Sequence, residues 1–509
     1  MPSGIVLWIR CRIYERGHLL TEATLLPVGS SRTFLPLALL ASILFAGASG
    51  CSGAGDGSIA VELVYPLAPA ASASAASARP AAYPLDNTNR IRIRVLAPHF
   101  APIEKWFHRF DGRGEIGGIP PGTRITVEVD EYDNTAIPSG DAVLAAPLLG
   151  RGWYNGITLS PGEVKTVPVA MYAKGTIVTV CGAPASGGSG TSGDNTADGI
   201  LAAEAYLGNP TAVKAGPGGS IYVSSSAYKK VKRIDRYGYL SDVAGDGTHG
   251  TITAGAPAAS APVGAVQDID IDPAGNLYLF NDFNQIVRID NGVVNKLVYD
   301  NGVENTAARF NLAVVNVDLL YFVNYLDPRV YQASGTSKSD YVTDNLPYDT
   351  TEPFSRFNYP LRAPSSATYA SMSDSLIFAD TDNDRIMRLS FADLNIYYYA
   401  GYPGGGSFVD NIDASAMTLA RPRIVDYNPI TGKIFFIEGS SSRVLYIDAV
   451  GKVRLLAGTG TNEFSGDGGP ATAAGLNDPR AIAVDSRGNA YIADYGNHAI
   501  RMVVGGALP

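Results

Sequence analysis

Carboxylates are the residues of this chain whose spacing could support metal chemistry. Asp380, Asp382 and Asp384 alternate in the segment ADTDNDR, a spacing that resembles the start of a calcium-binding loop. The glycine and the terminal glutamate that such a loop needs further along are absent. Two interpretations of the segment stay open, a calcium site and a solvated hairpin turn, and we expect no resident cofactor.

The sequence offers too few ligands for a catalytic zinc site. A catalytic zinc site uses about three His, Cys or carboxylate side chains and keeps one position open. Of the five histidines, only His249 and His498 lie in the C-terminal two-thirds of the chain, and His498 stands in a predicted turn. Of the three cysteines, Cys181 replaces an alanine at a strand end, which predicts a small buried residue.

Other catalytic motifs are also missing from the sequence. No Gly-x-Ser-x-Gly elbow, phosphate-binding loop or paired-cysteine motif occurs. The run SGDGG at 465–469 could suggest a phosphate cradle, but neither a lysine nor a helical pattern follows it. We therefore expect an ordinary loop there.

The elements that would position these residues repeat along the chain. The segment 456–503 contains SGDGGPATAAGLNDPRAIAVDSRGNAYIADYGNHAIR, and weaker copies precede it. Each copy has a strand that ends in Ala-Gly, a glycine-rich loop, a Gly-Asn turn, an aromatic strand and a polar hairpin. Four strands per copy predict a blade of a β-propeller.

Six copies can be counted from the aromatic strand that follows each turn. These strands begin at Tyr222, Tyr278, Tyr321, Ile377, Phe435 and Tyr491. Five outer strands follow the same count, and the missing one lies upstream, at 176–182. We expect this strand to complete the last blade, because such a closure removes the exposed sheet edges of an open array.

These motifs resemble the NHL repeat family, whose typical blade contains a near match to the run quoted above. The resemblance covers 175–503 and is specific in the second and last copies, but poor in the third, which lacks the Gly-Asn turn. It implies an all-β fold, a six-bladed NHL-type β-propeller over 175–509, that usually serves as a binding or scaffold platform. Some relatives are metal-centred enzymes, including peptide-amidating lyases, but they rely on several propeller histidines that have no counterparts here.

The first 50 residues carry the pattern of an export signal. Arg32 precedes an apolar stretch at 34–46, which runs into Ala-Ser-Gly before Cys51. The apolar core is too short for a stable membrane span. The small residues before Cys51 resemble a lipobox, which predicts a lipid-anchored outer-membrane lipoprotein; the alternative is an ordinary signal peptide cut near Gly50 and a secreted protein. The length of the leader suggests a start codon downstream of Met1.

A second folded unit is expected over 57–173. Strand-like alternation at 58–65 and 90–97 flanks a Pro/Ala/Ser-rich loop at 66–84, and further strands follow at 124–129 and 165–171. Short strands with turn signals and no helical period predict a β-sandwich, which resembles carboxypeptidase-regulatory or immunoglobulin-like modules. Its expected role is to space the propeller from the membrane.

The composition fits an exported β protein. The 509 residues are 46% hydrophobic and 17% charged, and 56 of them are glycine, as in turn-rich β domains with large cores. The formal net charge of −9 provides no basic field, so we expect no nucleic-acid partner. The sequence indicates no oligomeric state.

One face of the predicted propeller gathers acidic and aromatic loop residues. The candidate binding residues are Phe283, Tyr325, Asp380, Asp382, Asp384, Glu438, Phe464, Asp467, Asp494 and Tyr495. Carboxylates orient polar groups while rings bury area, so a protein, peptide or carbohydrate ligand is expected. The alternative is that these residues only form turns.

Two functions stay open. The favoured one is a non-enzymatic binding or scaffold platform in the cell envelope. The other is a metal-assisted hydrolase or lyase that uses carboxylates lining the central channel, for which Asp268, Asp270 and Asp426 are the candidates.

Overall fold

The computed structural model describes most of the chain after residue 89. The described residues are 12–15, 18–22, 57–64, 90–108, 116–133, 148–161, 163–182, 198–250, 252–283, 285–299, 310–317, 319–334, 337–343, 352–401, 408–439 and 441–508. The predicted export signal, Cys51 and the loop at 66–84 lie outside these residues. Contacts divide the chain into two compact units, Met1–Thr176 and Ile177–Pro509.

Strands make up nearly all of the regular structure in the described residues, which form an all-β protein. The short 3-10 helices are η3 (Ala202–Glu204), η4 (Pro217–Gly219), η5 (Ala258–Ser260), η6 (Thr381–Asn383), η7 (Ala471–Ala473) and η8 (Tyr495–Asn497). A search of the described residues finds no helix with the length and hydropathy of a membrane span.

The first unit contains a seven-stranded sheet and a separate antiparallel pair. The pair is β1 (Arg12–Glu15) and β2 (His18–Glu22). The sheet runs in the order β5 (Phe100–His108), β4 (Arg90–Ala97), β7 (Arg124–Tyr132), β8 (Leu148–Thr158), β9 (Val164–Ala173), β3 (Gly57–Val64) and β6 (Ile116–Ile119). Strands β3 and β9 pair in parallel, whereas the other neighbours are antiparallel.

The two faces of this sheet differ because its strands alternate. On β4, Ile91, Ile93 and Val95 are fully buried in a core that also contains side chains from the two edge strands β5 and β6. A single sheet can share one core between its two edges only if it curves over itself. The predicted arrangement in two sheets stays a prediction. On the opposite face of β4, Arg92 pairs with the buried carboxylate of Asp130 at 2.6 Å.

The second unit contains six antiparallel sheets in its described part. The first three sheets are β11 (Pro210–Ala215), β12 (Ile221–Ser225), β13 (Lys230–Ile234) and β14 (Leu240–Ala244); β15 (Val266–Ile271), β16 (Leu277–Asn281), β17 (Ile286–Asp290) and β18 (Val293–Tyr299); and β19 (Phe310–Asn316), β20 (Leu319–Asn324), β21 (Asp327–Ser334) and β22 (Ser337–Val342).

The other three sheets each include an edge strand that comes earlier in the chain than their inner strand. They are β24 (Pro364–Ala370), β25 (Ser375–Asp380), β26 (Arg385–Ser390) and β27 (Asn395–Ala400) with β23 (Phe354–Ser355) at the edge; β29 (Pro422–Tyr427), β30 (Ile434–Glu438), β31 (Arg443–Ile447) and β32 (Lys452–Ala457) with β28 (Ile412–Asp413); and β33 (Pro479–Val484), β34 (Ala490–Asp494) and β35 (Ala499–Val503) with β10 (Ile177–Cys181).

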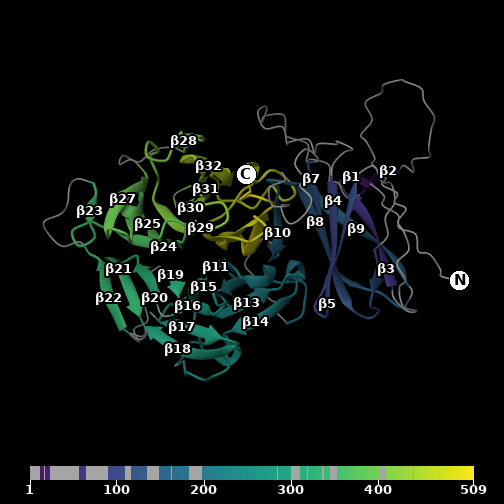
Figure 1. The fold of residues 1–509 in the computed structure, drawn as a ribbon, viewed down its shortest axis with the longest axis horizontal. Helices are drawn as coiled ribbons and strands as arrows, with labels where there is room; N and C mark the ends of the chain where they lie inside the picture. The colour runs from purple at the N-terminus through teal and green to yellow at the C-terminus, as the bar shows by residue number, and fades with distance from the viewer. Residues whose placement is uncertain are drawn as a thin grey trace. The chain divides into compact units, whose positions relative to one another are not determined.

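The sheets of this unit form a closed ring. The first strand of each sheet contacts the first strand of the next, in the order β11, β15, β19, β24, β29 and β33, and β33 contacts β11 again. In Figure 1 the inner strands β11, β15, β19, β24 and β29 gather at the centre, while β14, β18, β22 and β27 lie at the rim. Second strands such as β16, β25 and β30 are buried along their whole length, because a sheet packs against each of their faces. This is the arrangement of a β-propeller.

Strand β10 joins the ring at the end of the chain. It pairs antiparallel with β35, with Ile177 opposite Val503. The loop that contains the run SGDGG also holds this strand, because the Ile177 N–H donates to the Gly469 carbonyl at 3.0 Å and the Gly468 N–H donates to the Ile177 carbonyl at 2.8 Å. The glycine-rich run thus binds the backbone of β10.

Candidate functional site

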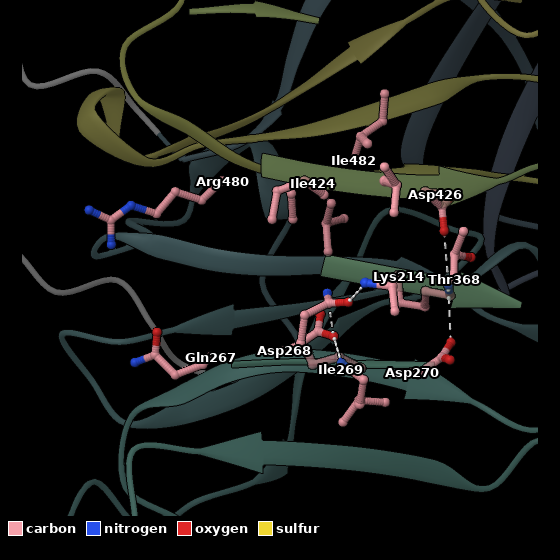
Figure 2. Close-up of a pocket in the computed structure, with 16 residues that line it drawn as sticks. Lys214, Gln267, Asp268, Ile269, Asp270, Thr368, Ile424, Asp426, Arg480 and Ile482 are labelled. Atoms are coloured by element: carbon pink, nitrogen blue, oxygen red, sulfur yellow. Dashed lines mark hydrogen bonds and ion pairs between the residues drawn. The ribbon is translucent and has the colours of Figure 1, made fainter. Parts of the chain in front are cut away.

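The centre of the ring holds a lysine between two carboxylates. The Lys214 Nζ atom of β11 lies 3.0 Å from Asp270 Oδ1 of β15 and 3.0 Å from Asp426 Oδ1 of β29, as Figure 2 shows. Both carboxylates are buried and the lysine is partly buried. The two negative charges raise the pKa of Lys214 against the opposing effect of burial, so the lysine is a cation at neutral pH. Burial raises the pKa of Asp426, although the ammonium opposes this.

Asp268 precedes Asp270 by two residues on β15 and therefore lies nearer the beginning of this inner strand. Its Oδ2 atom accepts hydrogen bonds from Asn311 Nδ2 and from the Leu312 N–H, both at 2.8 Å, and both donors belong to the neighbouring sheet. Burial raises the pKa of this carboxyl to about 8, and the negative charge of Asp270 adds to the effect. Asp268 therefore holds its proton through most of the acidic and neutral range.

The polar side chains around the channel satisfy the exposed edges of the inner strands. An inner strand has no ladder partner on its channel side, so its backbone groups need other partners. The Val314 N–H donates to Asp270 Oδ2 at 2.7 Å, and the Ala367 N–H donates to Asn311 Oδ1 at 2.6 Å. The Val425 N–H donates to Ser366 Oγ at 3.0 Å. These bonds connect neighbouring sheets and give the channel polar residues a structural role.

The channel is too small for an organic substrate. The cavity that Asp268, Asp270, Asp426 and Lys214 line measures about 40 Å³. One water needs roughly 10–15 Å³ of such volume, so the cavity holds a few waters. The sequence brought the three carboxylates together as candidates, but it missed Lys214, whose ammonium occupies the position that a bound cation would take. In the described part of the chain no group of three or more His, Cys, Asp or Glu side chains could hold a metal.

Lys214 could have been found from the sequence. Counted from the start of each inner strand, Lys214 in PTAVK, Asp270 in VQDID and Asp426 in PRIVD all occupy the fifth position. Strand residues at equal positions lie in one layer of the ring and point toward the same axis. Alignment of the inner strands therefore predicts the three side chains as neighbours.

Three of the predicted binding carboxylates are buried within the turns. Asp380 accepts from the Tyr359 hydroxyl at 2.6 Å and from the Arg362 N–H at 2.8 Å. Asp494 accepts in the same way from the Asn477 N–H at 2.7 Å, and Glu438 lies 3.5 Å from Arg443 Nη1. Burial raises the pKa values of Asp380 and Asp494 to about 6. Asp380 and Asp494 bond the loop that precedes their own sheet, whereas Glu438 contacts Ser441 and Arg443 of its own hairpin; all three have almost no exposed surface.

Phe464 and Asp467 surround a buried arginine. Arg501 of β35 is fully buried, and its Nη2 atom lies 2.7 Å from Asp467 Oδ1. Its guanidinium lies over the Phe464 ring, 4.5 Å from the centroid. Asp467 Oδ2 also accepts from the Thr179 N–H of β10 at 3.2 Å. The two predicted binding residues therefore connect the last strand of the chain with the strand that closes the ring.

Phe283 and Tyr495 are each covered by a neighbouring side chain. The Phe283 ring lies edge-on to His249, with ring centroids 5.0 Å apart. The guanidinium of Arg480 lies 3.2 Å from the centroid of the Tyr495 ring. His498, in contrast, is part of a turn, with a positive φ of 55° and an Nδ1 atom that accepts from the Asn209 N–H at 3.2 Å. Both rings keep only part of their surface for a ligand.

Asp382 and Asp384 contact a single arginine in different ways. Asp382 Oδ1 lies 2.7 Å from Arg421 Nη2, whereas Asp384 Oδ1 accepts from the Arg421 N–H at 2.8 Å. Asp380 points to Tyr359 and Arg362 instead. The three carboxylates of the ADTDNDR segment thus engage separate protein donors, and the segment carries no shared cation position in the described residues.

An open groove of about 810 Å³ lies between the third and fourth sheets. It contains two of the predicted binding residues, Tyr325 and Asp382. The lining residues come from the β20–β21 turn, the loop before β24 and η6: Tyr325, Leu326, Pro328, Pro360, Leu361, Arg362, Ala363, Asp382 and Asn383. Its size falls in the range of ligand pockets, roughly 300–1,000 Å³.

The sequence did not identify the arginines beside this groove. Arg362 lines it, and Arg421 reaches it through Asp382 and through the Tyr325 hydroxyl, which lies 2.5 Å from Arg421 Nη2. The signals available were the runs ARPR at 420–423 and DPR at 478–480, in which arginine flanks the proline that begins an inner strand. From the sequence alone, these runs indicate only turns, because the sequence does not show which residues lie near the arginines in space.

Comparisons with known proteins find one family model and several solved structures. A family model described as NHL repeat matches residues 476–501. No curated protein matches the sequence. Among solved structures, the chain is similar to a protein of unknown function from Bacteroides thetaiotaomicron VPI-5482, with 13% identity over 81% of this chain and 90% of that one and a TM-score of 0.49.

Two further structures have names that indicate a role. An auxiliary nutrient binding protein from Bacteroides ovatus ATCC 8483 shares 15% identity over 81% of this chain and 90% of that one, with a TM-score of 0.43. A catalytically inactive virginiamycin B lyase from Staphylococcus aureus, solved with quinupristin, shares 12% identity over 74% of this chain and 90% of that one, with a TM-score of 0.36. The NHL repeat match and the closed ring of sheets together identify this chain as a β-propeller protein with an NHL repeat.

Proposed function

We propose that the second unit is a six-bladed NHL-type propeller that binds a protein, peptide or carbohydrate ligand without catalysing a reaction. The observation that carries this proposal is the groove between the third and fourth sheets. The groove has room for an organic ligand, and it combines apolar surface with a few polar side chains, which is the usual composition of a binding site.

The groove is built on rigid elements. Tyr325 and Leu326 sit at the tip of the hairpin between β20 and β21, and the loop opposite is tied to Asp380 through the Arg362 N–H and the Tyr359 hydroxyl. Because these bonds hold the loop that forms one wall, a ligand would meet a wall that is already ordered and lose less free energy to ordering of the protein. The buried carboxylate of Asp380 thus holds the loop that forms one wall of the groove.

The channel supports the non-enzymatic class over the metal-assisted alternative. Its cavity of about 40 Å³ has room for a few waters only, and the ammonium of Lys214 offsets part of the negative charge of Asp270 and Asp426. The carboxylates of Asp268 and Asp270 also hold the backbone of β19. Each candidate ligand of a catalytic metal therefore has a structural partner.

We further propose an envelope location. The apolar stretch at 34–46 and the small residues before Cys51 support export and lipid attachment. The sheet of the first unit suits a spacer module, and we propose that this module is a β-sandwich. This placement would present the groove outside the cytoplasm, where it can meet external or periplasmic ligands.

A selection experiment tests the binding function. The full chain is exposed to a displayed peptide library and to an immobilised glycan panel, and the retained ligands are measured against Tyr325→Ala and Leu326→Ala variants. We expect a loss of at least about tenfold in affinity, because both residues line the groove. Tyr237→Ala, a tyrosine in the turn after β13, is the matched control. Equal binding by all four proteins, or metal-dependent turnover of a captured ligand, would overturn the proposal.

A further inference from the structure

Two arginines flank the groove, and their guanidinium groups have N–H donors that no contact in the described part of the chain uses. Arg362 is exposed, and its guanidinium makes no hydrogen bond or ion pair within the described residues. Arg421 is 47% exposed and shares its Nη2 atom between Asp382, at 2.7 Å, and the Tyr325 hydroxyl, at 2.5 Å. An arginine offers five N–H donors, so neither side chain is saturated by these contacts.

The positive charge continues from the groove toward the channel. Arg423 and Arg480 share one carboxylate, since Asp478 Oδ1 lies 3.5 Å from Arg423 Nη1 and Asp478 Oδ2 lies 2.8 Å from Arg480 Nη2. Burial lowers the pKa of Arg423, and the nearby charges of Arg421 and Arg480 lower it further. The three guanidinium groups are thus close enough to repel one another.

The local charge opposes that of the whole chain. Four guanidinium groups, those of Arg362, Arg421, Arg423 and Arg480, lie near three carboxylates, those of Asp382, Asp384 and Asp478, on a protein of formal net charge −9. A basic patch of this kind in an acidic protein attracts anions and discriminates against cationic ligands. Asp380, Glu438 and Asp494, which the sequence offered as acidic binding residues, are buried and add almost no exposed surface.

Apolar surface lies beside the charge. Leu326 is 58% exposed at the groove, next to Pro328 and Pro360. The aromatic rings offer less open surface to a ligand, because Arg480 lies over the Tyr495 ring and the Tyr325 hydroxyl is bonded to Arg421. Sugars stack on open aromatic planes, whereas aliphatic and proline surfaces suit peptide side chains.

We propose that the groove binds an acidic peptide segment, with its carboxylates on Arg362 and Arg421 and an apolar side chain against Leu326. This inference rests on the proposed function and names its ligand class. Asp382 is a competitor in this arrangement, because a ligand carboxylate must share or displace its contact with Arg421. Arg423 and Arg480 extend the charge along which a longer acidic segment would lie.

Fluorescence anisotropy with defined peptides tests the inference. The probes are labelled Gly-Ser-spaced peptides of equal length that carry leucines together with glutamates, lysines or serines. We expect the glutamate peptide to bind best and to weaken as salt rises from ~0.05 to ~0.3 M. Arg362→Glu should weaken it by roughly tenfold or more, since one substitution removes an attraction and adds a repulsion. Asp382→Asn should strengthen it by a few-fold.

The control and the remaining outcomes separate this inference from the proposed function. Arg236→Glu, in the turn between β13 and β14, makes the same change of charge away from the groove and should leave binding as it was. Preference for the lysine or serine peptide that still depends on Leu326 would overturn the acidic class and leave the groove as a binding site. Capture of a uronate oligosaccharide in place of all peptides would overturn the peptide class. Groove variants without effect on any probe would overturn both proposals.

Discussion

Gly182 packs against the carbonyl oxygen of His498, at the point where the beginning and the end of the propeller chain meet. A Cβ atom on Gly182 would overlap this oxygen and approach Ala499 Cα within 2.9 Å. Gly458 occupies the same position against Ser442, and both glycines have positive φ angles, 85° and 100°. The Ala-Gly strand end that recurs in the sequence is therefore a site of close backbone contact, and Cys181-Gly182 is one copy of it.

Replacement of Gly182 should open the closing strand. Gly182→Ala places a methyl group on backbone atoms that cannot move aside, so we expect a loss of about 2–4 kcal/mol in the free energy of unfolding. Gly175→Ala is the matched control, because Gly175 has a similar φ of 82° and no atom within 4 Å of the added Cβ. Denaturant midpoints measure both. Equal losses would show that φ strain, not the contact with His498, decides the effect.

Loss of the ammonium at the centre of the ring should be costly. Lys214→Met leaves Asp270 and Asp426 buried without their shared cation, which should cost roughly 3–5 kcal/mol in stability. Adding Asp270→Asn and Asp426→Asn should restore most of the loss. Lys452→Met, which breaks the exposed pair with Asp413 at 2.8 Å, serves as control and should cost less than about 1 kcal/mol. The urea midpoint is the measurement, and similar losses for the two lysines would contradict the argument.

Stability should fall with pH because of Asp268. The folded protein holds this proton up to a pKa of about 8, whereas an unfolded aspartate releases it near 3.8. Between these values the folded state binds more protons than the unfolded state, so the free energy of unfolding declines as pH rises. Asp268→Asn, which keeps an acceptor for the Leu312 N–H, should remove a decline on the order of 3–4 kcal/mol between pH 5 and pH 8. Parallel pH profiles for the two proteins would refute the assignment.

Lipid attachment should depend on a single thiol. Cys51→Ser should abolish incorporation of radiolabelled fatty acid and release the protein from membranes, because Cys51 follows the small residues of the predicted lipobox. Cys181→Ser is the control, since Cys181 is buried in the ring and burial raises its pKa to about 12. Labelling that persists in the Cys51 variant would favour an ordinary signal peptide.

Local features of the fold were accessible from the sequence because they depend on neighbours in the chain. The predicted Gly-Asn turns include Gly275 and Gly488, whose φ angles are positive, at 91° and 79°. In the turn that contains Gly488, the Asp485 Oδ1 atom accepts from the Arg487 and Asn489 N–H groups, both at 2.9 Å. Turn type, strand alternation and the NHL repeat follow from spacings of a few residues.

The candidate site depended on residues that only the ring brings together. The sequence by itself determined the repeat, its turns and the all-β class, and it named Tyr325 and Asp382, which line the groove. Only the tertiary structure decided that Asp380 and Asp494 are buried and that Arg362 and Arg421 flank the groove. Lys214 and Asp426 are separated by 212 residues in the chain but by 3.0 Å in space. The burial and charge of a side chain are set by such distant partners, and one sequence does not record which strands will face one another across the channel.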